Sequence, residues 1–158
     1  MQLDGKTLIA PPPFVEVDVT YEPGRAGAAD EDWCALQIHT QNRVYDVDWG
    51  MRCFAVTDVD TGEPDPDNRL IGAILTGGQK RGEGGLELSF PVPRPGVAAV
   101  FEVGEPPKAD YVTTSDVKRV VLRIRVLTVS DEVAAPSWKA LTGAFRATRT
   151  GHSDPEAR

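Results

Sequence analysis

The sequence has few of the residues on which most catalytic and cross-linked sites depend. Among its 158 residues there are only two histidines, His39 and His152, and two cysteines, Cys34 and Cys53. Two cysteines are too few for a disulfide framework, so we expect both to be buried free thiols in a reducing cytoplasm. Because Cys34 and His39 fall on opposite faces of a strand, they cannot jointly form a thiolate–imidazole pair.

Long apolar runs and an excess of positive charge are also missing. The apolar runs are far shorter than the ~20 residues that a membrane-spanning helix needs, and residues 1–13 do not have the pattern of a signal peptide. The net charge of −7 disfavours contact with phosphates. We therefore expect neither a membrane nor a nucleic-acid partner.

What the sequence does have is a regular alternation of apolar and polar residues. Along residues 14–21, Val15, Val17, Val19 and Tyr21 share one face while polar residues take the other, which predicts a half-buried strand. Short segments of this kind, separated by Gly- and Pro-containing turns, recur along the chain at 33–40, 43–49, 51–56, 70–75, 86–90, 97–103 and 117–129. The spacing predicts an antiparallel β-sandwich of about eight strands, with a small closed β-barrel as the alternative.

The two ends of the chain differ from this pattern. Residues 1–13, which end in three prolines, are expected to form an extended arm, and residues 148–158 a flexible tail, around a single domain at 14–147. Before the tail, Ser137 is the expected N-cap of one short helix. Its apolar residues Trp138, Leu141 and Phe145 recur at helical spacing, so we expect the helix to dock on the sheets.

An acidic segment at residues 58–68 is the best metal candidate. Asp58, Asp60, Asp65 and Asp67 supply oxygen ligands of the type that calcium prefers. The segment departs from the EF-hand pattern, however, because Gly62 and Glu63 occupy its fifth and sixth positions and no glutamate occupies the twelfth. A solvated connecting loop is therefore the simpler interpretation, with calcium as the only cofactor considered.

Basic residues offer candidate binding sites in two places. Arg119, Arg123 and Arg125 lie in the last predicted strand, and Lys80 and Arg81 lie in a glycine-rich stretch, 77–85, that reads as a hairpin loop. Both groups are candidates for binding phosphates or carboxylates. For the arginines, pairing with acidic residues on a neighbouring strand is the simpler alternative.

Taken with the scarcity of catalytic residues, the uneven charge favours a binding role. Residues 1–68 contain 14 acidic and 4 basic residues, whereas the remainder has a small basic excess. The expected function is a non-catalytic protein-interaction module, an accessory or structural subunit that binds another protein or its own copies. The alternatives are a barrel that binds a small apolar ligand, and a small enzyme that uses His39.

Overall fold

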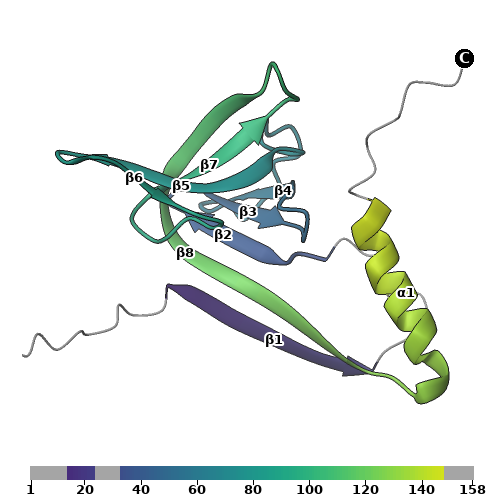
Figure 1. Ribbon diagram of the computed structural model, residues 1–158. Coiled ribbons are helices and arrows are strands. Elements are labelled where there is room, and N and C mark those ends of the chain that lie inside the picture. Colours follow the sequence, from purple (N-terminus) through teal and green to yellow (C-terminus); the bar gives the residue numbers. More distant parts are fainter. Residues whose placement is uncertain (1–13, 24–32, 148–158) are drawn as a thin grey trace, which may run out of the picture.

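The computed structural model describes residues 14–23 and 33–147, with side chains as far as Lys139. The predicted arm at 1–13 and tail at 148–158 lie outside the described residues. Within them, eight strands precede one helix (Figure 1): β1 (Val15–Pro23), β2 (Leu36–Thr40), β3 (Arg43–Val47), β4 (Cys53–Asp58), β5 (Ile74–Gly82), β6 (Gly85–Ser89), β7 (Ala98–Val103), β8 (Asp110–Thr128) and α1 (Asp131–Ala147).

The strands form one mostly antiparallel sheet. Seven of them lie in the order β4-β3-β2-β8-β7-β5-β6, and β1 pairs with β8 in the parallel direction. The first part of β8, from Asp110 to Asp116, pairs with β7, and from Val117 onward its other edge pairs with β2. The all-β prediction with a single C-terminal helix is confirmed.

Because β8 belongs to both halves of the sheet, the halves fold over one another and enclose a common core. Tyr45 from β3 packs on Phe101 from β7 with ring centroids 5.4 Å apart. Ile38, Phe101 and Val120, which come from β2, β7 and β8, are fully buried in this core. This face-to-face packing is how a sandwich buries its apolar side chains.

The closed barrel considered as the alternative is wrong, because, among the described residues, β4 at one end of the sheet meets β5 near the other end at one corner only. An isolated bridge joins Arg52 to Ile74, and the Cys53 N–H donates to the Ala73 carbonyl at 2.8 Å. Since β4 and β5 both begin at this corner and then diverge, their overlap is too short to form a ladder.

Most of the glycine-rich stretch is strand and not the predicted hairpin loop, which is limited to a turn at Glu83 and Gly84. Gly77 and Gly78 lie inside β5, which pairs with β6 as far as Gly82. A Cβ atom on Gly77 would lie 2.2 Å from the Ser89 carbonyl oxygen, and one on Gly78 would lie 2.7 Å from a methyl carbon of Val97. Glycine is present at both positions because other residues of the same chain approach too closely for any side chain.

Two element boundaries also differ from the predictions. Strand β8 begins at Asp110, seven residues before the apolar run that signalled it. Helix α1 begins at Asp131, with Asp131 and Glu132 in the first turn, where acidic side chains favour the helix dipole. Ser137 is therefore not the N-cap, and its hydroxyl donates to the Val133 carbonyl one turn earlier at 2.6 Å. The side chains of Leu141 and Phe145 lie outside the described ones, so the docking of the helix on the sheets through them stays a prediction.

Candidate functional site

Strand β1 and residues 119–128 of β8 form a parallel ribbon that extends away from the two halves of the sheet (Figure 1). Strand β2 also pairs with β8 as far as Leu122, and beyond that point the ribbon is two-stranded. We call it the ribbon. Its register pairs Val15 with Val120 at the inner end and Pro23 with Thr128 at the outer end. Among the described residues, β1 pairs with no strand except β8, so its second edge is free.

One face of the ribbon is charged, and it holds the three arginines predicted as binding residues. Arg119 donates to Glu16 at 2.5 Å, Arg123 lies 3.8 Å from Asp18, and Arg125 is ion-paired with Glu22. The guanidinium of Arg125 also stands over the Trp33 ring, 5.3 Å from its centroid. The structure thus pairs the arginines with acidic residues of β1, as the simpler alternative expected.

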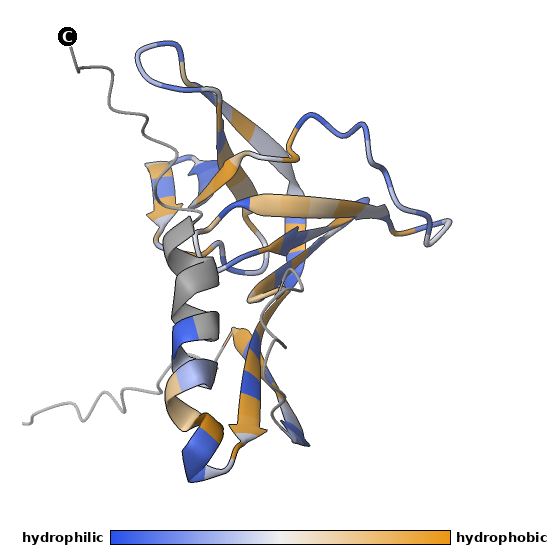
Figure 2. Ribbon diagram, turned by 90° about the vertical axis from the view of Figure 1, so that its right-hand side faces the viewer, coloured by the Kyte–Doolittle hydropathy of each residue, from blue (hydrophilic) through white to orange (hydrophobic). Residues whose placement is uncertain are grey.

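The other face of the ribbon is apolar and uncovered toward its outer end. At the inner end, Val15 and Leu122 pack against the core. Farther out, Val17 is 57% and Tyr21 76% exposed. Alternating apolar and hydrophilic bands follow the ribbon in Figure 2. We call its exposed side chains the ribbon apolar face: Val17, Val19, Tyr21, Ile124 and Val126. The prediction of β1 as a strand is confirmed, but the prediction that its apolar face is buried is wrong.

A second free edge with an apolar row lies on β6. This strand pairs only with β5 among the described residues. Leu86, Leu88 and the following Phe90 alternate with polar residues, and Phe90 is 86% exposed. Lys80 and Arg81, the other predicted binding residues, are exposed on the neighbouring strand opposite Glu87 and Leu86. We call this region the hairpin edge. Since β7 separates β5 from β8, the structure does not join these two cations to the arginines of the ribbon.

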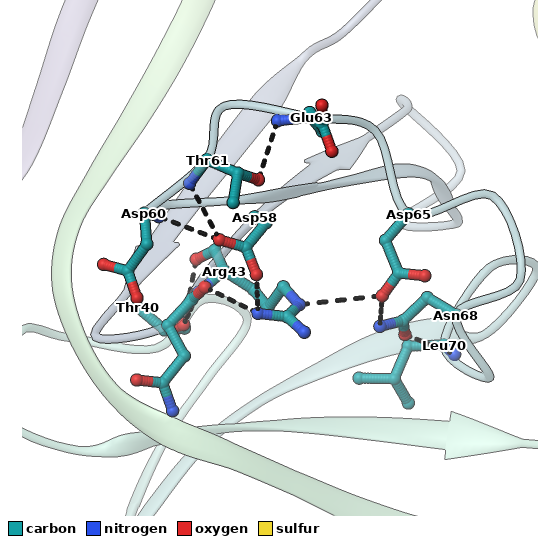
Figure 3. A network of polar contacts seen from close by, with 10 residues as sticks. Thr40, Arg43, Asp58, Asp60, Thr61, Glu63, Asp65, Asn68 and Leu70 are labelled. Carbon is teal, nitrogen blue, oxygen red and sulfur yellow. Dashed lines mark hydrogen bonds and ion pairs between the residues drawn. The ribbon is translucent and has the colours of Figure 1, made fainter.

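The acidic segment proposed for calcium is organised around an arginine instead (Figure 3). Arg43 lies 2.5 Å from Asp58 and 3.6 Å from Asp65. The N–H groups of Thr61 and Asp60 donate to the other Asp58 oxygen, and the Thr61 bond is the main cause that lowers the pKa of Asp58. No three His, Cys, Asp or Glu side chains of the described residues are grouped as metal ligands.

Next to this network is an open surface hollow of about 410 Å³. Its walls are largely polar, which does not match the small apolar ligand of the alternative hypothesis. The residues that line it come from the β2–β3 turn, the acidic segment and the start of β8: Asn42, Arg43, Tyr45, Asp60, Asn68, Arg69, Leu70, Val112, Thr113, Thr114 and Ser115.

His39, the residue on which an enzyme hypothesis depends, lies on β2 outside this hollow. Its Nε2 atom is 3.0 Å from the Gln37 side-chain oxygen. Burial lowers its pKa, and the nearby Arg119 acts in the same direction. Its described hydrogen-bond partner is an amide, and the nearby carboxylates of Asp46 and Glu16 act on its pKa in the opposite direction, toward a higher value.

Both cysteines are buried free thiols, as predicted. Burial is the main cause that raises the pKa of Cys34 and that of Cys53 to about 12. At about pH 8, we expect the folded protein to react with an aromatic disulfide reagent roughly a thousandfold more slowly than the urea-unfolded chain, because thiolate is the reactive form. Absorbance of the released thiol measures this rate, and similar rates in both states would contradict the burial of the two thiols.

Comparison with known proteins gives no relative for this arrangement. No family model, curated protein or solved structure matches the chain. Within residues 14–23 and 33–147, no helix has the length and apolar character that a membrane span requires. The functional conclusion therefore depends on the geometry of the ribbon itself.

Proposed function

We propose that this protein is a non-catalytic protein-interaction module, an accessory or structural subunit that binds through its ribbon. The observation that supports this role is the ribbon apolar face. It extends the apolar row that begins at the core with Val15 and Leu122, and its own side chains are exposed to solvent. Each exposed apolar side chain that a partner covers contributes about 1 to 3 kcal/mol to binding. A contiguous apolar surface of this kind marks an interaction site more often than an isolated exposed residue does.

The architecture of the ribbon supports the same role. A two-stranded ribbon is marginal in water, since it has no layer against which its apolar face can pack. Here the Arg119–Glu16 and Arg123–Asp18 ion pairs are exposed, and exposed ion pairs each add less than about 1 kcal/mol. The third pair, Arg125–Glu22, is partly buried. A partner that covers the opposite face would therefore add to the stability of the ribbon.

The test is affinity purification from the native host with matched variants of the tagged chain. We expect the double variant Val17→Lys, Tyr21→Lys to lose its co-purifying chain by about tenfold or more, because two charges would be buried in the interface. Tyr111→Lys is the control, since Tyr111 is also exposed but lies at the other end of β8. Recovery is quantified by mass spectrometry and includes untagged copies of the same chain. Undiminished recovery with the double variant would refute a role for the ribbon.

A further inference from the structure

The open surface hollow beside the Arg43 network is lined by polar side chains that are unpaired within the described part of the chain. Five of these side chains form neither a hydrogen bond nor an ion pair with another described residue: Asn42, Asp60, Arg69, Thr113 and Ser115. They come from the β2–β3 turn, from the acidic segment and the residue after it, and from the start of β8. Unpaired polar groups that converge on one hollow are what a site for a small polar molecule presents.

The neighbouring polar side chains, in contrast, are held by bonds within the protein. Asn68 donates to Asp65 at 2.9 Å, and its oxygen accepts from a backbone N–H at 3.0 Å. The Thr114 hydroxyl accepts from a backbone N–H at 3.1 Å. In Figure 3 this network surrounds Arg43, while the carboxylate of Asp60 is directed away from it. The walls of the hollow are therefore fixed, and a ligand can bind the free side chains without breaking a bond of the fold.

The free side chains carry one charge of each sign. Asp60 and Arg69 line the same hollow but do not form an ion pair with each other. With the amide of Asn42 and the two hydroxyls, they offer both donors and acceptors and no net charge. A simple anion would be repelled by Asp60, and a simple cation would be repelled by Arg69. The best match is therefore a neutral ligand whose polar groups both donate and accept.

We propose that this hollow is a binding site for a neutral polyhydroxylated ligand such as a sugar ring. Because every sugar hydroxyl both donates and accepts, adjacent hydroxyls can donate to the carboxylate of Asp60 and accept from the guanidinium of Arg69. A hydrophilic ligand also suits an open hollow, since the part that is not covered stays hydrated. The site goes beyond the proposed interaction role, because it lies at the start of β8, whereas the ribbon begins at Arg119.

A small zwitterion such as glycine is the alternative ligand, because its two charges match Asp60 and Arg69. Both side chains are exposed, and exposed ion pairs contribute little to binding. Glycine would also leave the amide of Asn42 and the hydroxyl of Thr113 without partners, whereas the hydroxyls of a sugar can pair with both. The sugar is therefore the better match, and glycine is included in the test.

The test is titration of the isotope-labelled full chain, followed by NMR, with glucose, galactose, mannose and N-acetylglucosamine in turn. At least one of these sugars should shift the backbone amide signals of the five free residues. We expect a Kd of roughly 1 mM, because a ligand of about twelve to fifteen non-hydrogen atoms remains partly in water in an open site. Calcium, inorganic phosphate and glycine are titrated in the same way and should bind more weakly than that sugar.

Two single variants show whether the sugar binds in the hollow. Asp60→Ala and Arg69→Ala should each weaken its binding about tenfold, because each removes a charge-assisted hydrogen bond. The matched controls Asp67→Ala and Arg81→Ala remove exposed charges of the same kind outside the hollow and should leave the Kd unchanged. The double variant of the ribbon should also bind the sugar as the wild type does. Circular dichroism verifies that each variant is folded, as expected for substitutions at exposed side chains.

Three results would overturn the proposal. The first is no shift at the five residues with any of the four sugars up to about 50 mM. The second is tighter binding of calcium, phosphate or glycine in the hollow. The third is a Kd that is unchanged in either hollow variant or is raised equally in the controls. Failure of the interaction role is a separate outcome, because that role is measured by the partner that the ribbon variant recovers from the host.

Discussion

Replacing Phe101 with alanine is expected to lower the free energy of unfolding by about 3 to 5 kcal/mol, a large part of the stability of a domain this size. Phe101 is 0% exposed and meets Tyr45 from the opposite half of the sheet. Removing its ring leaves a cavity between the halves that β8 cannot close, since β8 is hydrogen-bonded to both. Urea unfolding followed by circular dichroism measures the loss.

The matched control for this substitution is Tyr111→Ala. Tyr111 is an aromatic residue on β8 next to β7, but it is 66% exposed, so its removal should change stability by less than about 0.5 kcal/mol. A similar loss in both variants would mean that the ring of Phe101 is not held between the halves, and would contradict the sandwich packing.

Replacing Gly77 with alanine should also destabilise the protein strongly, by about 3 kcal/mol or more. Its φ angle of 136° is one that residues with side chains rarely adopt, and the added carbon would meet the Ser89 carbonyl oxygen at 2.2 Å. Because that oxygen belongs to the backbone, relief requires β5 and β6 to separate. The change is measured by urea unfolding.

Gly82→Ala in the same strand is the control. A Cβ atom there would have no neighbour within 4 Å, so alanine should be neutral or slightly stabilising. If Gly77→Ala were as stable as Gly82→Ala, the close approach between β5 and the end of β6 at Ser89 would be wrong, and so would the position of the hairpin edge.

Alternation was sufficient to predict the strands whose two faces differ. In β2, Leu36 and Ile38 are buried and alternate with the half-buried Gln37 and His39, and the turn into β3 follows as expected. Alternation did not predict the strands whose conformation depends on pairing with another segment of the chain. The sequence predicts a loop at Gly77 and Gly78, because it does not show which residues approach them in the fold. Residues 110–116 of β8 have little apolar character, and β7 makes them strand by pairing with them.

The candidate site was predictable only in its parts. The sequence shows the arginines of β8 and the acidic residues of β1, but their register joins residues about a hundred positions apart, and no local signal encodes it. Nor can a period-2 pattern reveal whether the apolar face it predicts is covered. The Arg43 network had a local signal in its aspartates, yet Arg43 itself stands 15 residues before Asp58 in the chain.

The pairing of β1 with β8 has a consequence for how the protein is made. Glu16 is synthesised 103 residues before Arg119, its partner across the ribbon. At roughly 5 to 20 residues per second, the ribosome releases β1 about 5 to 20 s before the strand that holds it exists. During that interval each nascent chain displays an aliphatic strand with both edges open. Neighbouring ribosomes on one message would bring such strands close together, so a chaperone that holds β1 until translation ends would raise the yield of folded protein.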